Sequence, residues 1–309
     1  MKHKVVCIGA MLVDELFFCK EPVVAGTSNP AHIKRTAGGV MRNIVQHLQL
    51  LDIPVQFITV VGNDADGEWL KSECRNIGID TSTTITASCS TGKYAAILQP
   101  DGNLYTAVAV NPAEAYLSVS VLQEYEEVLG SATIIIADTN LDAKVIEWLI
   151  KWCKEKNILC CIEPVSVAKA RKLSNISLDG LYMVTPNEDE LPSLSVNRTD
   201  ENSALQELLQ RGVQHIWLRK GAAGSAIASA NGIYSLPSPK VEVKDITGAG
   251  DAALAAWIVA FSLGKTEMQC LETAHTMAAI VLQTKGAIVS DISQEKLFST
   301  IKNYYPDAV

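Results

Sequence analysis

The second half of the chain alternates short apolar segments with helical ones, and this alternation restricts the possible folds more than any other feature. Strand-like segments separated by helical patterns cover 133–137, 158–162, 181–184 and 215–219. Such alternation predicts a parallel sheet wrapped by helices through right-handed crossovers. A further continuous apolar run, 5–10, is typical of a buried parallel strand. The sequence therefore predicts an α/β fold.

The segment 245–251, Asp-Ile-Thr-Gly-Ala-Gly-Asp, runs directly into the apolar stretch 252–261, which is predicted to form a helix buried on every side. A small glycine-containing turn that opens a helix leaves backbone N–H groups aimed outward, and the helix dipole adds partial positive charge. Gly248, Ala249 and Gly250 are therefore predicted to bind an anion.

Asp251 would stand in the first turn of that helix, beside the bound anion. A carboxylate there repels phosphate, so we interpret it as the group that accepts a proton from an attacking hydroxyl in phosphoryl transfer. A tight strand-to-helix turn, with Asp251 complementing the helix dipole, is the structural alternative.

A second glycine-containing segment, 37–43, also opens a predicted helix, because apolar residues recur after it at helical spacing. The paired glycines Gly38 and Gly39 let the backbone approach a ligand closely, and Asn43 offers both a donor and an acceptor to a polyol. A glycine-rich helix start without a ligand is the alternative.

An acidic segment follows the predicted strand that ends at Val184. Asn187 and Glu190 are three residues apart, so on a first helical turn they share a face and can order the waters of Mg²⁺ or a phosphate. The same pair also fits a capping box, with Asn187 as the N-cap. Both interpretations are open from these residues alone.

The two glycine-containing motifs, in this order, resemble the ribokinase-like (phosphofructokinase-B type) family of sugar and nucleoside kinases, and the resemblance extends from Val5 to Ala287. It implies a single three-layer domain over 1–309, with a central, mainly parallel sheet flanked by helices. It also implies a small β-sheet lid formed by about 15–36 and 91–110, which agrees with the hairpin signal Pro-Asp-Gly-Asn at 100–103. ATP and Mg²⁺ are the implied phosphoryl donor and metal.

The resemblance also assigns roles to individual residues. Asp251 is implied to be the catalytic residue. The residues implied to bind the sugar are Asp14, Gly38, Gly39 and Asn43. The implied ATP-binding residues are Asn187, Lys220, Gly221, Gly224 and His275. Asn187 and Glu190 are implied to order Mg²⁺ through water, and Asp245 and Thr247 to lie at a K⁺ site.

Two positions of this chain, His275 and Arg219, depart from the family pattern. Relatives often carry an adenine-contacting asparagine where this chain has His275, and a buried, satisfied histidine is an equally good interpretation. Relatives usually carry a small hydroxyl residue in place of Arg219, so the resemblance does not extend to ATP contact by this side chain.

Asn140 and the segment 163–170, together with Ile246 in the anion-loop motif, are similar to the pseudouridine kinase branch. That branch implies phosphorylation of the 5′-hydroxyl of pseudouridine, with Asn140 near the substrate. Asn111 stands where the branch has an acid. Ribose, another nucleoside or a phosphosugar are open as substrates. So are a non-catalytic sensor and an assembly domain on the same fold.

The formal net charge of −8 and the isoelectric point near 5.2 argue against a nucleic-acid polymer as partner, because such a partner demands a basic face. No basic-then-apolar leader precedes the first strand and no apolar run is long enough for a bilayer, so we expect a cytoplasmic protein without a membrane partner. The eight cysteines contain no C-x-x-C pair and are predicted to be buried, reduced thiols. Open lid edges predict a homodimer.

Overall fold

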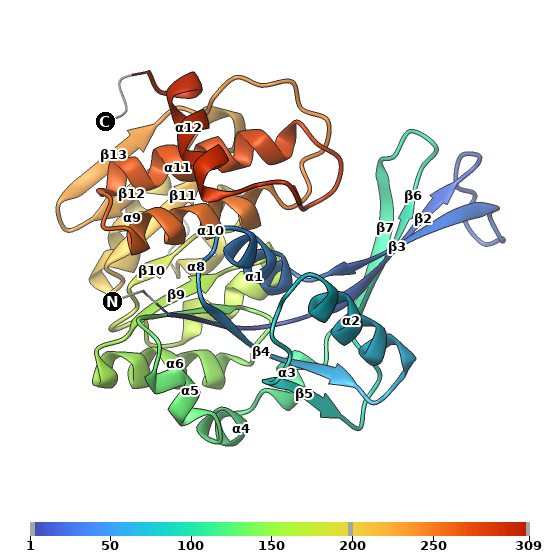
Figure 1. The fold of residues 1–309 in the computed structure, drawn as a ribbon, viewed down its shortest axis with the longest axis horizontal. Coiled ribbons are helices and arrows are strands. Elements are labelled where there is room, and N and C mark those ends of the chain that lie inside the picture. The colour runs from blue at the N-terminus through green and yellow to red at the C-terminus, as the bar shows by residue number, and fades with distance from the viewer. Residues whose placement is uncertain (1–3, 197–199, 307–309) are drawn as a thin grey trace.

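The computed structural model describes residues 4–196 and 200–306 and has the predicted α/β architecture (Figure 1). In these residues a nine-stranded sheet has the order β13-β12-β11-β10-β9-β8-β1-β4-β5. Its strands are β1 (Val5–Ile8), β4 (Val55–Gly62), β5 (Thr84–Ala87), β8 (Ile134–Asp138), β9 (Leu159–Glu163), β10 (Met183–Val184), β11 (His215–Arg219), β12 (Ser225–Ser229) and β13 (Gly232–Leu236).

The sheet is parallel from β5 to β11, as the alternation predicts, and antiparallel at the edge formed by β12 and β13. The connections before β12 and β13 are too short for a crossover helix, so these strands can only return as hairpins. β10 contains only two residues, which is shorter than the predicted 181–184.

Helices cover both faces of the sheet, which confirms the three-layer arrangement (Figure 1). One face is covered by α1 (Val40–Leu50), α2 (Ala65–Asn76), α10 (Ala249–Ser262), α11 (Glu267–Leu282) and α12 (Gln294–Tyr304). The other face is covered by α3 (Ala113–Tyr116), α4 (Val119–Gln123), α5 (Glu126–Gly130), α6 (Ala143–Lys156), α7 (Val167–Ala170), α8 (Leu191–Leu194) and α9 (Glu201–Gln210).

Helix α10 is the most deeply buried of the long elements, as its uniformly apolar sequence predicts. Every residue from 252 to 260 is buried, including Trp257. The helix packs against both α1 and α11. The turn that precedes α10 is therefore attached to a rigid support.

A separate four-stranded sheet, the lid, projects from the main body, and it includes both segments that were predicted to form it (Figure 1). Its strands, in sheet order, are β3 (Ala31–Gly38), β2 (Leu12–Cys19), β6 (Lys93–Leu98) and β7 (Leu104–Val110). Gly102 adopts φ of 87° in the predicted hairpin between β6 and β7.

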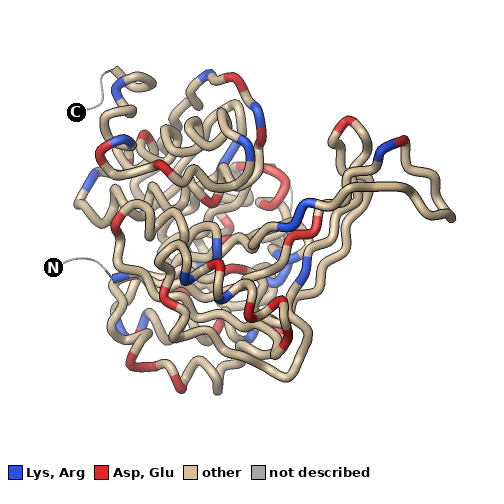
Figure 2. The backbone as a smooth tube through the Cα atoms, turned by 45° about the vertical axis from the view of Figure 1, so that its right-hand side comes forward, with Lys and Arg blue, Asp and Glu red and all other residues tan. Residues whose placement is uncertain are grey.

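Charged residues of both signs gather where the lid strands leave the main body (Figure 2). Asp66, at the start of α2, pairs with Arg35 of β3 and with Lys93 of β6, the latter at 2.7 Å. The Arg35 guanidinium also lies 4.4 Å from the ring centroid of Trp69. These contacts connect two lid strands to one helix of the body.

The cysteines agree with the prediction of reduced thiols. All eight are free and all but Cys89 are buried. None of the helices in the described part of the chain combines the length and the apolar character needed to span a bilayer.

Candidate active site

Polar residues stand at the carboxyl ends of four neighbouring parallel strands. Asp138 ends β8, Glu163 ends β9, Asn187 follows β10 and Arg219 ends β11. Open α/β sheets bind their ligands outside this edge. A ligand site is therefore expected at this edge of the sheet.

A cavity of about 780 Å³ opens between these strand ends and the start of α10. Its volume is within the range of small-molecule sites. The residues that line it include Glu163, Asn187, Glu190, Arg219, Gly250 and Asp251. The cavity thus brings three of the predicted motifs together.

In the predicted anion loop, Gly248 to Gly250, the backbone N–H of Ala249 donates to the carbonyl oxygen of Ile246 at 3.4 Å and is not free for a ligand. Gly248 is the N-cap of α10 with φ of 75°, and a Cβ there would lie only 2.5 Å from the Cβ of Ala287. Only glycine fits this position. The backbone N–H groups of Gly250 and Asp251 find no acceptor among the described residues, so they are free for a ligand.

Asp251 lies beside this loop, and the Nδ2 of Asn43 donates to its Oδ2 at 2.8 Å. This hydrogen bond joins α1 to α10. It was not predicted from the sequence, where Asn43 was assigned to binding the sugar. The pKa of Asp251 is raised to about 7, chiefly by burial with a smaller contribution from Glu163, and against the opposing effects of the Asn43 hydrogen bond and of Arg219. A carboxylate with a pKa near neutrality suits a general base.

Asp14 lies in lid strand β2, whereas its position shortly after the apolar run 5–10 predicts that it lies at the carboxyl end of the first strand. The first strand ends at Ile8, and the chain re-enters β structure at Leu12 to pair with β3. The carboxylate of Asp14 lies over Gly38, where a Cβ would come 2.0 Å from its Oδ2. Burial raises the pKa of Asp14 to about 6.

Gly39 is the N-cap of α1 and adopts φ of 103°. A Cβ there would lie 2.5 Å from the carbonyl oxygen of Ala10. The two glycines of this motif therefore allow Asp14 and the chain after β1 to approach the start of α1.

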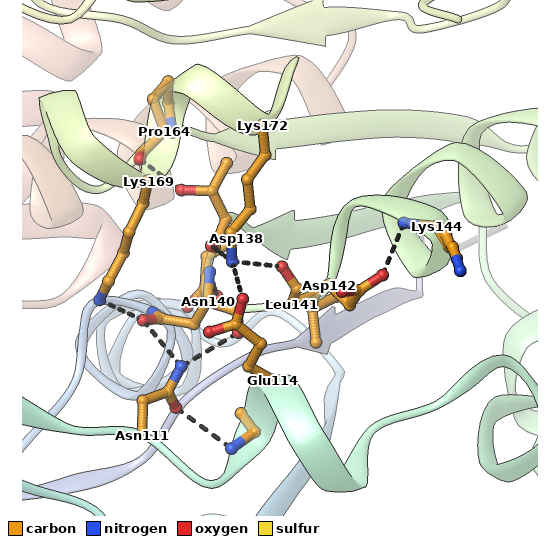
Figure 3. A network of polar contacts seen from close by, with 12 residues as sticks. Asn111, Glu114, Asp138, Asn140, Leu141, Asp142, Lys144, Pro164, Lys169 and Lys172 are labelled. Carbon is orange, nitrogen blue, oxygen red and sulfur yellow. Dashed lines mark hydrogen bonds and ion pairs between the residues drawn. The ribbon is translucent and has the colours of Figure 1, made fainter. Parts of the chain in front are cut away.

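Asn140 is the centre of a polar network at the end of β8 (Figure 3). Its Oδ1 accepts hydrogen bonds from the Nζ of Lys169 and, at 3.3 Å, from the Nδ2 of Asn111. Its backbone N–H donates to Asp138 at 2.9 Å. We call Asn111, Asn140 and Lys169 the Asn140 cluster. Sequence reasoning gave no role to Lys169, although it lies in the segment that resembles the pseudouridine kinase branch.

Asn187 and Glu190 form reciprocal bonds of the capping-box type in the turn before α8, but the N-cap of α8 is Glu190 and not the predicted Asn187. The backbone N–H of Asn187 donates to Glu190 Oε2 at 3.0 Å, and the N–H of Glu190 donates to Asn187 Oδ1 at 2.8 Å. Both residues also line the cavity, so the structural role does not remove them from the site. The described residues contain no group of three or more His, Cys, Asp or Glu that could hold a metal ion. Mg²⁺ in kinases keeps several waters and needs only one or two carboxylates, which this site provides.

The predicted nucleotide residues separate into two groups. Gly221, Gly224 and His275 line the cavity. The ammonium group of Lys220 instead bonds Glu201 at 2.5 Å, and Lys220 is not part of the lining.

His275 has partners on both ring nitrogens. Its Nε2 lies 2.7 Å from the Oγ of Ser225 and its Nδ1 lies 2.9 Å from the hydroxyl of Tyr305. Burial lowers the pKa of His275 to about 4, so the ring is neutral. This geometry is that of a buried, satisfied histidine, which also forms part of the cavity wall.

Asp245 bonds groups of its own chain. Its Oδ1 accepts from the N–H and the hydroxyl of Thr247, at 2.9 and 2.7 Å, and its Oδ2 accepts from the N–H of Gly286 at 2.9 Å. Asp245 and Thr247 therefore bond each other directly, and their role at a K⁺ site stays a prediction. Their direct bond shapes the turn before α10.

Arg219 also lines the cavity, although the family resemblance did not assign it to ATP binding. Its Nη2 donates to Glu163 Oε1 at 2.8 Å, and its Nη1 lies 2.7 Å from where a Cβ of Gly250 would stand. The guanidinium is thus in direct contact with the anion loop. The signal in the sequence was the position of Arg219 at the end of a parallel strand.

The model of the family described as pfkB family carbohydrate kinase matches residues 2–294. The pseudouridine kinase of Escherichia coli (strain K12) is 26% identical over 308 residues, which cover 98% of this chain and 97% of that protein. The pseudouridine kinase of Arabidopsis thaliana is 24% identical, over 93% of this chain and 90% of that protein. Among solved structures, Arabidopsis thaliana ribokinase complexed with ribose and ATP superposes with a TM-score of 0.84 at 24% identity, covering 98% of this chain and 99% of that one.

Proposed function

The chain belongs to the pfkB family of carbohydrate kinases, and from this membership we propose that it transfers the γ-phosphoryl group of ATP to the 5′-hydroxyl of a ribosyl substrate, pseudouridine. The family makes it a phosphotransferase with an alcohol group as acceptor. The observation that carries the proposal is the partly buried carboxylate of Asp251, with its raised pKa, directly beside the anion loop.

In the proposed reaction, Asp14 and the backbone at Gly39 hold the sugar so that its 5′-hydroxyl faces the γ-phosphate. Asp251, held by Asn43, accepts the proton of that hydroxyl as the oxygen attacks phosphorus. The amides of the anion loop stabilise the charge on the transferring group. Asn187 and Glu190 would hold the waters of Mg²⁺, which supplies positive charge to the phosphates.

The Asn140 cluster supports pseudouridine as the nucleoside. Its amides and ammonium offer donors to uracil carbonyls and acceptors to N–H groups. Pseudouridine is joined to ribose through carbon, so its base carries one more N–H than uridine. Asn111 stands where the branch has an acid, and its amide oxygen is still a hydrogen-bond acceptor for this additional N–H.

We test the substrate by measuring ADP release from Mg·ATP with pseudouridine, uridine, other nucleosides, ribose and phosphosugars, in K⁺ and in Na⁺. We expect selective turnover of pseudouridine. Turnover of another compound instead would support the kinase activity and reject pseudouridine as the substrate. Binding of a compound from the panel without any turnover would favour a non-catalytic sensor. The comparison of K⁺ with Na⁺ tests the proposed cation site near Asp245 and Thr247.

We also propose a homodimer that forms through the lid. The support is a group of exposed apolar side chains on the lid strands, which a monomer would leave in water. They are Ile33, Ile97, Leu104, Tyr105, Val108 and Val110. Light scattering on the purified protein should give twice the chain mass, and a Val108→Lys variant should give the mass of one chain.

Replacing Asp14 by alanine should raise KM for the sugar by about 100-fold or more, because two hydrogen bonds that its partly buried carboxylate would accept from the sugar hydroxyls are lost. KM for ATP should change little, since Asp14 lies in the lid strand and not on the cavity lining. Steady-state kinetics with each substrate varied in turn measure both values. An equal rise in the two KM values would contradict the role.

Replacing Lys169 by methionine should lower discrimination between pseudouridine and other ribosides, because the variant keeps the length of the chain but loses the ammonium donor. We expect the ratio of kcat/KM for pseudouridine over ribose to fall by about tenfold or more. Lys172 bonds Glu114 and the carbonyl of Leu141 rather than Asn140, so the same substitution at Lys172 is the control for loss of an ammonium group. An unchanged ratio in the Lys169→Met variant would remove Lys169 from the specificity site.

A further inference from the structure

Arg219 occupies an unusual environment for an arginine at a strand end. Its side chain is 17% exposed and its partner Glu163 is 4% exposed. Glu163 is itself held from the other side, because the hydroxyl of Thr185 donates to its Oε2 at 2.6 Å. Glu190 Oε2 lies 3.8 Å from Arg219 Nη2. The guanidinium thus lies between two carboxylates, one at the end of β9 and one at the N-cap of α8.

The donors of Arg219 are only partly used. Nη2 bonds Glu163, whereas Nε is buried without a hydrogen-bond partner among the described groups. Nη1 also has no described acceptor, and it is the atom that lies against Gly250. A buried, unsatisfied donor of a charged group is costly, so such groups normally have a partner. Of these unused donors, Nη1 lies beside Gly250 on the cavity wall, where a ligand would come.

The carboxylates that line the cavity favour a cation at the position of Arg219. Glu163, Glu190 and Asp251 all line the cavity, and a triphosphate would add further negative charge beside them. Arg219 contacts or neighbours all three of these residues. A planar guanidinium is suited to phosphate oxygens, which it binds with parallel hydrogen bonds.

We propose that Arg219 binds the β- and γ-phosphates of ATP directly, with Nη1 donating to a phosphate oxygen beside the anion loop. Glu163 and Glu190 position the guanidinium for this contact. The proposal rests on the proposed function, since it assumes ATP in the cavity. It gives this chain a phosphate ligand that does not follow from the family pattern, in which a small hydroxyl residue occupies this position.

The test uses binding and kinetics of the full-length Arg219→Gln and Arg219→Lys variants. Isothermal titration gives Kd for Mg·ATP, Mg·ADP and adenosine without any sugar, so the result does not depend on the identity of the acceptor. We expect Arg219→Gln to weaken ATP binding by about tenfold or more and to leave adenosine binding unchanged, because adenosine carries no phosphate. We expect kcat to fall by about 100-fold or more, since charge on the transferring group loses a donor. Arg219→Lys should recover part of both losses.

Two further variants separate phosphate contact from a structural role. Arg75→Gln removes an exposed arginine of α2 outside the cavity and should match the wild type in every measurement. Glu163→Gln removes the charged partner of Arg219 while leaving the guanidinium, and should retain the preference for ATP over adenosine.

Each outcome bears on the proposal. An equal loss of ATP and adenosine affinity in Arg219→Gln would show a structural role and overturn it. Retention of ATP affinity and kcat within about threefold of the wild type would also overturn it. If Arg219→Gln does not fold, the Arg219→Lys variant decides. The lysine ammonium should bind ATP more weakly than the arginine guanidinium does, and adenosine affinity should be unchanged. Failure of the wild type to bind ATP would instead refute the proposed function.

Discussion

Replacing Asp251 by asparagine should lower kcat by about two to four orders of magnitude, as loss of a general base typically does. Kd for Mg·ATP should stay close to the wild-type value, because the amide is similar in shape to the carboxylate and its oxygen can still accept the bond from Asn43. Single-turnover kinetics with saturating sugar measure the chemical step directly. A variant that retains most of its turnover would exclude Asp251 as the base.

The pH profile should report the same carboxylate. The pKa of Asp251 is raised to about 7, so below pH 7 the group becomes protonated and cannot accept the proton of the substrate hydroxyl. We expect kcat/KM to fall about tenfold for each pH unit below this value and to level off above it. In the Asp251→Asn variant the remaining activity should lose this dependence.

Stability should respond in the opposite direction. Because the folded-state pKa of Asp251 lies above its ordinary value, the folded protein binds this proton more tightly than the unfolded chain does. The corresponding stabilisation is present at low pH and is lost as the pH rises through about 7. The Asp251→Asn variant should therefore have a higher Tm than the wild type at pH 8 and a smaller difference at pH 5, measured without ligands.

Replacing Gly248 by alanine should disable the anion loop. An alanine at φ of 75° costs about 1–2 kcal/mol, and its Cβ would also lie 2.6 Å from the Cα of Ala287, so backbone must shift. The shift displaces the amides that we expect to bind the transferring phosphoryl group. We expect kcat/KM to fall by about 100-fold or more.

Gly264 provides a matched control for the conformational cost alone. It adopts φ of 73° and a Cβ there would meet no atom within 4 Å. Gly264→Ala should lower the free energy of unfolding by about 1–2 kcal/mol and leave the kinetics unchanged. Denaturant unfolding and steady-state assays on both variants distinguish strain from loop displacement. Equal kinetics in the two variants would refute the requirement for close approach at Gly248.

The sequence by itself determined the local features of this protein. Alternating apolar and helical segments specify a parallel α/β sheet, because each strand must be buried on both faces and each helix must cover it. The uniformly apolar stretch after Gly248 specifies a central helix. Asp251 and the anion loop are also predictable, since their chemistry depends on residues adjacent in the chain.

The tertiary structure alone decided the contacts between distant segments. The bond from Asn43 to Asp251 depends on how α1 packs against α10, and the contact of Arg219 with Gly250 depends on the position of β11 beside that helix. The placement of Asp14 in the lid depends on its pairing with β3. Lys220 pairs with Glu201 because the strand end directs the two neighbouring cations, Arg219 and Lys220, to different sides. Local periodicity carries no information about such contacts, since their energies arise only when the packed elements bring the groups together and remove water from between them.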